Sequence, residues 1–196
     1  MKQLSIIVTD ASPLITLAAS EALDTLLLPG LPVIIPDMVR FEVVRELHRP
    51  GALDVAAWIR KNEPHKVRVA STEVFEEYQV LTQVNPATKS KDRGEQAAAE
   101  VLGNELSSGE FGAILVFEDS LVRKQNFLLR LPDNVVVTST SEFLAGLEAK
   151  GHIPSADAIL QQAVSLRGAE ILNRHLQTTE ADQAQAPSWP DRMRAF

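Results

Sequence analysis

Residues 5–18, SIIVTDASPLITLA, contain two successive patterns that decide the fold. An apolar, β-branched run at residues 6–8 is typical of a buried strand, and it stops abruptly at Asp10. Apolar positions at helical spacing begin at Leu14, directly after a proline. The stretch therefore predicts a buried strand that leads into a helix, with a carboxylate at the point where the strand leaves the core.

The alternation of short apolar runs with helical patterns continues along the chain. It is typical of parallel β-α-β units and predicts an α/β fold, a three-layer sandwich with a small parallel sheet between helices. In such sheets ligands bind beyond the carboxyl ends of the strands. Strands are predicted over residues 4–9, 33–35, 67–69, 113–117 and 135–138, and helices over 12–18, 21–27, 36–47, 53–62, 71–84, 92–102, 119–128, 139–150 and 155–166.

The composition is that of an ordinary globular protein, since 45% of the 196 residues are hydrophobic and 23% are charged. We expect one domain over residues 1–170. The polar, aperiodic remainder, 171–196, is predicted to be an extension that Trp189 and Phe196 anchor on the body or on a partner chain.

The absence of cysteine excludes disulfides and fits a cytoplasmic location. No apolar run is long enough to span a bilayer.

Acidic residues occupy the positions where predicted strands end or where helices begin. Asp10 ends the first strand, and Asp119, preceded by Glu118, ends the run AILVFED in the same way. Glu42 lies on the helix after the second strand, and Glu95 lies in the first turn of a later helix. Because the carboxyl ends of parallel strands meet at one edge of a sheet, these acids can converge there.

Each acid also has a structural interpretation. Asp10 can be the N-cap of the helix that follows, a role for which Ser12 competes. Glu95 can interact with a helix dipole, and Glu42 can belong to a solvated helix face. The acids after the later strand can form a turn or a cap. Gly94 permits the close approach of backbone or ligand directly before Glu95.

A cluster of carboxylates at one sheet edge suits the metal-dependent hydrolysis of phosphodiester bonds. Mg²⁺ and Mn²⁺ prefer oxygen ligands. One ion lowers the pKa of a bound water to make the nucleophile, and a second ion about 4 Å away stabilises the leaving oxygen. The net charge of −7 argues against a nucleic-acid partner unless such cations reverse the charge locally. The sequence lacks the motifs of phosphate-binding loops, serine hydrolases and zinc proteases.

Four segments of the sequence together form a recognisable ordered set: TDASPLITLA (9–18), IPDMVRFEV (35–43), DRGEQAAAEVL (92–102) and LVFEDSLVRK (115–124). On these segments the sequence resembles the PIN-domain nucleases over roughly residues 4–162, and it is most similar to the VapC-type toxins. The resemblance implies a ribonuclease that binds Mg²⁺ or Mn²⁺ and is the toxin of a toxin–antitoxin pair. It also implies a homodimer and an antitoxin protein as a further partner.

The resemblance also implies roles for individual residues. Ser12 matches a small polar residue that hydrogen-bonds near the metal. Arg123 matches a basic residue after the fourth acid, where it can contact phosphate or lie on a solvated helix face. Arg93 is a second candidate for contact with RNA. The acids that match the family are, in chain order, Asp10, Glu42, Glu95 and, as the fourth, either Asp119 or Glu118.

Two alternatives to a nuclease remain. The first is a catalytically silent PIN-like protein that binds RNA or a protein partner. The second is a phospho-acceptor receiver domain, which is disfavoured because Thr9, and not a second acid, precedes Asp10. Basic residues near the acids can follow an RNA backbone or be ordinary solvated charges; they are Arg40, Arg45, Arg49, Lys89, Lys91 and Arg93.

Overall fold

A central sheet of five parallel strands organises the molecule, in the order β3-β2-β1-β4-β5. The computed structural model describes residues 3–45, 47–48, 50–118, 131–167 and 189–192. All five predicted strands are confirmed, with ends that differ by one residue at most. Their bounds are Leu4–Thr9 (β1), Val33–Pro36 (β2), Val67–Ala70 (β3), Gly112–Val116 (β4) and Val135–Thr138 (β5).

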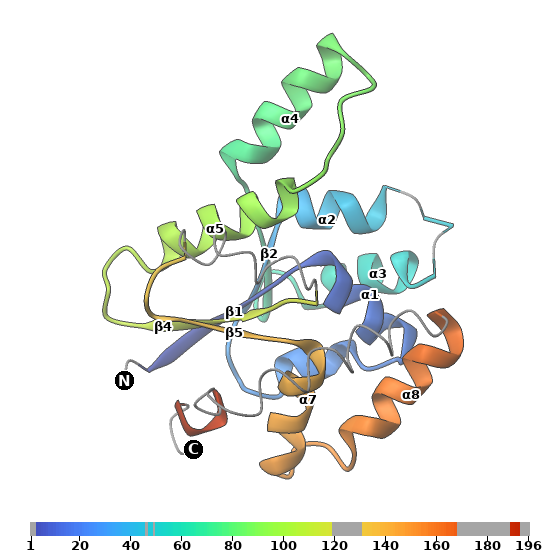
Figure 1. The fold of residues 1–196 in the computed structure, drawn as a ribbon, viewed down its shortest axis with the longest axis vertical. Coiled ribbons are helices and arrows are strands. Elements are labelled where there is room, and N and C mark those ends of the chain that lie inside the picture. Colours follow the sequence, from blue (N-terminus) through green and yellow to red (C-terminus); the bar gives the residue numbers. More distant parts are fainter. Residues whose placement is uncertain (1–2, 46, 49, 119–130, 168–188, 193–196) are drawn as a thin grey trace.

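Helices cover both faces of the sheet, so the predicted three-layer α/β sandwich is confirmed (Figure 1). Ile6 and Val8 face α5, whereas Ile7 between them faces the layer of α1, α7 and α8. This alternation follows from the two-residue period of a strand. None of the described helices is both long and apolar enough to cross a membrane. The helices are Ala11–Ala19 (α1), Asp37–Val44 (α2), Ala52–Asn62 (α3), Glu73–Val84 (α4), Arg93–Glu105 (α5), Thr140–Ala149 (α7) and Ala156–Arg167 (α8).

The strand order places a topological switch point between β1 and β4. After β1 the chain adds β2 and β3 on one side, and it then crosses over to add β4 and β5 on the other side. The crevice beyond the carboxyl ends of two such strands is the usual ligand site of an open parallel sheet. Asp10 follows β1 and Glu118 lies two residues after β4, so two of the predicted acids flank this crevice.

Two predicted helices differ from the structure. Residues 21–27 were expected to form a helix, but only a short 3-10 helix, Leu23–Leu27 (η1), is present, because Glu21 has a positive φ of 53°. The predicted helix 36–47 is observed only over Asp37–Val44, and Pro36 instead pairs with Ala70 as the last residue of β2. The predicted helix 119–128 lies outside the described residues.

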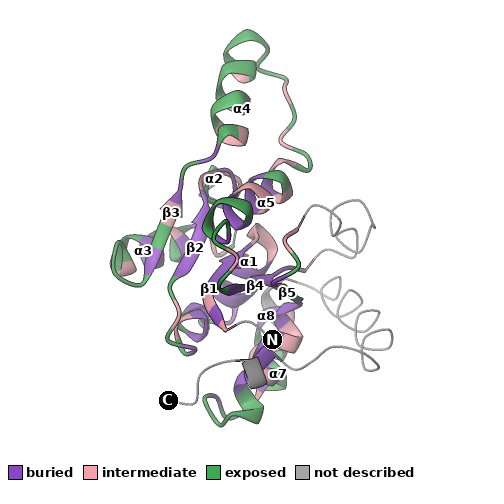
Figure 2. Ribbon diagram, turned by 90° about the vertical axis from the view of Figure 1, so that its left-hand side faces the viewer, coloured by how far each residue is buried: buried purple, intermediate pink, exposed green. Residues whose placement is uncertain are grey.

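Helix α4 projects from the body and the chain returns along it to α5 (Figures 1 and 2). We call α4 and the returning segment 85–92 the arm. Its base is fixed where the Thr72 amide donates to Asp37 Oδ2 at 3.0 Å. The Glu73 amide donates to Glu100 Oε1 of α5 at 2.8 Å. These bonds satisfy amides at the start of α4, and they hold the arm against α2 and α5.

Trp189 of the C-terminal extension lies on the body, in the 3-10 helix Trp189–Arg192 (η2). The indole is 4% exposed and stacks on Phe143 of α7, with the ring centroids 5.0 Å apart. A Cβ on Gly146 would lie 2.6 Å from Trp189 Cε2, so only glycine leaves room for the ring. Trp189 therefore anchors the extension on the body as expected, whereas Phe196 lies outside the described residues.

Candidate functional site

Asp10 is held rigidly at the carboxyl end of β1. Its backbone amide donates to the Val116 carbonyl of β4 at 3.2 Å, so the residue is tied to the neighbouring strand. Asp10 occupies the N-cap position of α1, but its side chain makes no capping hydrogen bond. The interpretation of this carboxylate as a plain helix cap is therefore wrong, because the side chain does not cap the helix.

Gly94 is the point at which two predicted acids meet. A Cβ built on this residue of α5 would lie 2.8 Å from Glu42 Oε2 and 3.4 Å from Asp10 Oδ1. Both carboxylates therefore approach the same small region of the α5 backbone, one from α2 and the other from the end of β1. Only a residue without a side chain leaves that region open. Glu95 follows directly, in the first turn of α5.

The surroundings of Glu42 raise its pKa from 4.5 to about 7. Burial is the main cause, and the negative charge of Asp10 is the next. A hydrogen bond from Ser90 and the positive charge of Arg45 oppose the shift, whereas the charge of Glu95 adds to it. The three acids Asp10, Glu42 and Glu95, which we call the acidic site, thus act on one another electrostatically.

The raised pKa of Glu42 predicts a pH-dependent stability in the metal-free protein. Between about pH 4.5 and 7 the folded state holds the proton more tightly than the unfolded chain does. The resulting stabilisation is present at low pH and is lost as the pH rises through 7. Allowing for solvent screening, we expect the free energy of unfolding to fall by about 2 kcal/mol in EDTA, and Glu42→Gln to remove that fall.

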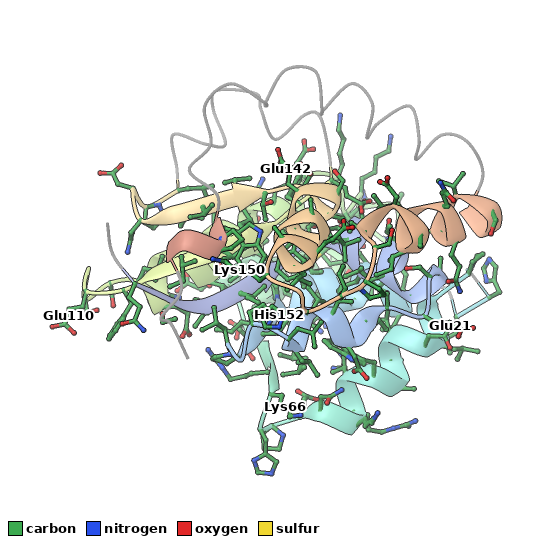
Figure 3. All side chains as sticks on the ribbon, turned by 90° about the horizontal axis from the view of Figure 1, so that it is seen from below. Glu21, Lys66, Glu110, Glu142, Lys150 and His152 are labelled. Atoms are coloured by element: carbon green, nitrogen blue, oxygen red, sulfur yellow. The ribbon has the colours of Figure 1, made fainter. Side chains whose placement is uncertain are left out.

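Urea unfolding between about pH 5 and pH 8 measures this dependence. Glu110→Gln is the matched control, because Glu110 projects into solvent away from the acidic site (Figure 3). The control is expected to keep the wild-type pH profile. A Glu42→Gln protein whose stability still falls like that of the wild type would show that another group titrates.

Glu118 lies beside α1 on the other side of the switch point. Its Oε2 accepts a hydrogen bond from the buried Thr16 hydroxyl at 2.9 Å, whereas its buried Oε1 has no hydrogen-bond partner among the residues that the structure describes. A buried carboxylate oxygen without a donor is costly and suits a site that receives a cation. Asp119 and Arg123 lie outside the described residues, so the choice between Glu118 and Asp119 as the fourth acid stays a prediction.

Two other predicted site residues have clear positions. Ser12 lies in the first turn of α1, directly after the Asp10 strand end. The Arg93 guanidinium lies over the ring of Tyr78, 5.5 Å from its centroid, and 3.7 Å from Glu77 Oε2. Arg93 therefore contacts the arm, and its ion pair with Glu77 does not occupy the acidic site.

Sequence reasoning missed two residues that contact the acids. Thr16 is a hydroxyl at a buried position of an otherwise apolar helix, which was a usable signal. Ser90 donates to Glu42 and accepts a hydrogen bond from Arg45 Nη1 at 3.2 Å. Ser90 lies in an irregular segment about fifty residues further along the chain, where no periodic pattern indicates which residue reaches the site.

The acidic site fits a hard divalent cation better than a softer metal. Its donors are carboxylate oxygens, which Mg²⁺ and Mn²⁺ prefer, and Mg²⁺ commonly binds through one or two carboxylates and several waters. Within the described part of the chain, no group of three or more histidine, cysteine or acidic side chains is arranged to hold a metal ion. The oxygens of Asp10 and Glu42 approach the same Cβ position at Gly94, so these two carboxylates would be the ligands of such an ion.

Comparison of the sequence with models of known protein families found no match, and comparison with curated proteins found none either.

Proposed function

We propose that the chain is a metal-dependent endoribonuclease that hydrolyses RNA phosphodiester bonds at the acidic site. The observation that carries the proposal is the approach of Glu42 Oε2 and Asp10 Oδ1 to the same region beside Gly94. Carboxylates held this close repel one another, and a divalent cation relieves that repulsion. The position beyond the switch point of a parallel sheet supports the same interpretation.

Asp10, Glu42 and Glu95 are the residues that would hold Mg²⁺ or Mn²⁺, together with Glu118 or Asp119. The bound metal would supply Lewis acidity and a water of lowered pKa. The chain itself supplies rigidity, because β1 fixes Asp10 and α5 opens a space at Gly94. The resemblance to VapC-type toxins leads us to propose further that the enzyme is the toxin of a toxin–antitoxin pair.

A second candidate is a catalytically silent protein of the same fold that binds RNA or a protein. One observation favours it: among the described residues, no group of three or more histidine, cysteine or acidic side chains is arranged to hold a metal ion. The two candidates differ in whether the protein binds Mn²⁺ and cleaves RNA in its presence, which makes them separable in one experiment.

Cleavage of a mixed single-stranded RNA pool with Mg²⁺, Mn²⁺ or EDTA tests the proposal. We expect metal-dependent cleavage by the wild type and a loss of about tenfold or more in Gly94→Ala, whose Cβ would displace the Glu42 carboxylate. Isothermal titration with Mn²⁺ should show the matching loss of affinity.

Gly103→Ala is the matched control for this experiment. Gly103 lies on the same helix, and a Cβ there meets nothing within 4 Å. The control should keep full activity and gain up to about 1 kcal/mol of stability from its better helix propensity. A wild-type protein that neither binds Mn²⁺ nor cleaves would favour the silent candidate, and equal activity in both variants would contradict the proposed site.

A further inference from the structure

Arg45 connects the acidic site to the arm. Arg45 is the C-cap residue at the carboxyl end of α2, one turn after Glu42. Its guanidinium lies over the ring of Phe41, 5.9 Å from the ring centroid. Its Nη1 donates to Ser90 Oγ at 3.2 Å, and the same serine bonds to Glu42. The ring and the hydroxyl therefore orient an exposed guanidinium at the rim of the acidic site.

Two further cations belong to the segment that Arg45 contacts. Lys89 and Lys91 flank Ser90 in the returning segment of the arm, and both are exposed. The Arg45–Ser90 hydrogen bond holds this segment against the end of α2. We call Arg45, Lys89 and Lys91 the basic rim. They are cations in sequence or hydrogen-bond contact with Ser90, next to an acidic site in a chain whose net charge is −7.

We propose that Arg45 binds a backbone phosphate of an RNA strand next to the acidic site, with Lys89 and Lys91 contacting the neighbouring phosphates. The inference rests on the proposed function, because it assigns the residues that position the substrate for that reaction. Arg45 would act as a positioning residue in cleavage.

Arginine suits this role better than lysine does. Its planar guanidinium forms paired hydrogen bonds with phosphate oxygens, and it is more weakly hydrated than an ammonium. Stacking on Phe41 and the bond to Ser90 fix its orientation before the substrate arrives, which lowers the entropic cost of binding. The lysines act as point charges that attract the strand without fixing its register.

Binding measured without metal separates the inference from catalysis. The probe is a fluorescein-labelled single-stranded RNA of about 12 nucleotides, and the readout is fluorescence anisotropy in EDTA at several KCl concentrations. We expect Arg45→Gln to weaken binding about tenfold and to lower the slope of log affinity against log salt by about one. Arg45→Lys should retain the slope while recovering only part of the affinity.

Arg60→Gln is the matched control. Arg60 is exposed in the last turn of α3, shortly before β3 begins. Arg60 therefore lies near the amino-terminal ends of the parallel strands, whereas the acidic site lies at their carboxyl ends. The control should bind RNA as the wild type does, with the same salt slope. The double change Lys89→Gln and Lys91→Gln should lower the slope by about two.

Cleavage with Mn²⁺, measured in parallel, distinguishes the two ways to fail. If the wild type cleaves RNA but Arg45→Gln binds with unchanged affinity and slope, the inference is overturned and the nuclease stands. If binding depends on Arg45 but no metal supports cleavage, the RNA contact stands and the nuclease is overturned. A wild type that binds RNA at low salt neither in EDTA nor with Ca²⁺, which compensates the carboxylate charges, overturns the inference directly.

Discussion

Asp10→Asn is expected to reduce metal-dependent RNA cleavage by at least about a hundredfold while the protein stays folded. Loss of a residue that merely supports a metal ligand costs about 10–100-fold, and the loss of a ligand costs no less. The asparagine keeps the shape of the side chain but removes the charge that faces Glu42 across Gly94. The measurement is the initial rate of cleavage of the RNA pool with Mn²⁺.

The same substitution separates a metal ligand from a helix cap. Asparagine caps a helix about as well as aspartate does, and the Asp10 side chain makes no capping bond here. We therefore expect no loss of stability. The metal-free protein should instead gain about 1 kcal/mol above pH 7, because the repulsion between Asp10 and ionised Glu42 is gone. Lower activity together with equal or higher stability is the signature of a functional acid.

Asp54→Asn is the control for the charge change itself. Asp54 is exposed in the first turn of α3. Like Asp10 it is an aspartate near the start of a helix, but it lies outside the acidic site. Its substitution should leave cleavage unchanged. An Asp10→Asn protein that cleaves at the parental rate would exclude Asp10 from the mechanism, and with it the assignment of the acidic site.

The fold could be predicted from the sequence because its signals are local and periodic. Residues 6–8 of β1 are all apolar because this strand is central and covered on both faces, and the other strands are recognised in a similar way. Because the sheet is parallel, an acid that directly follows β1 must lie at the carboxyl edge of the sheet, where ligands usually bind. The exceptions are also local, since Glu21 adopts a positive φ that nothing in its neighbours indicates.

The site could be predicted only as a set of residues, without its contacts. The sequence indicates that Gly94 permits a close approach, but only the structure identifies Glu42 and Asp10 as the groups that approach it. The roles of Ser90 and Arg45 depend on how the arm returns to α5, which is a tertiary arrangement with no periodic signature. Similarly, the sequence does not indicate why residue 146 is a glycine. The structure gives the reason, because Trp189 packs directly against it.

The pair of Trp189 and Gly146 gives the largest expected change in stability. Trp189→Ala should lower the free energy of unfolding by about 3–5 kcal/mol, because a buried indole stacked on Phe143 is removed. Gly146→Ala should lower it by about 2 kcal/mol, because the new Cβ would overlap the indole at Cε2 and Cζ2, 2.6 Å and 2.8 Å away. Urea unfolding followed by circular dichroism measures both changes.

The two substitutions should couple strongly when they are combined. Once Trp189 is an alanine, the Cβ of Gly146→Ala meets no ring, and its effect should reverse to a gain of up to about 1 kcal/mol from helix propensity. The coupling energy is therefore expected to be about 3 kcal/mol, at the upper end for residues in contact. Additive effects would mean that the extension does not pack on α7 in solution. Retained RNA cleavage in the double variant would then show that this anchor is separate from the acidic site, which lies where β1 ends and α5 begins.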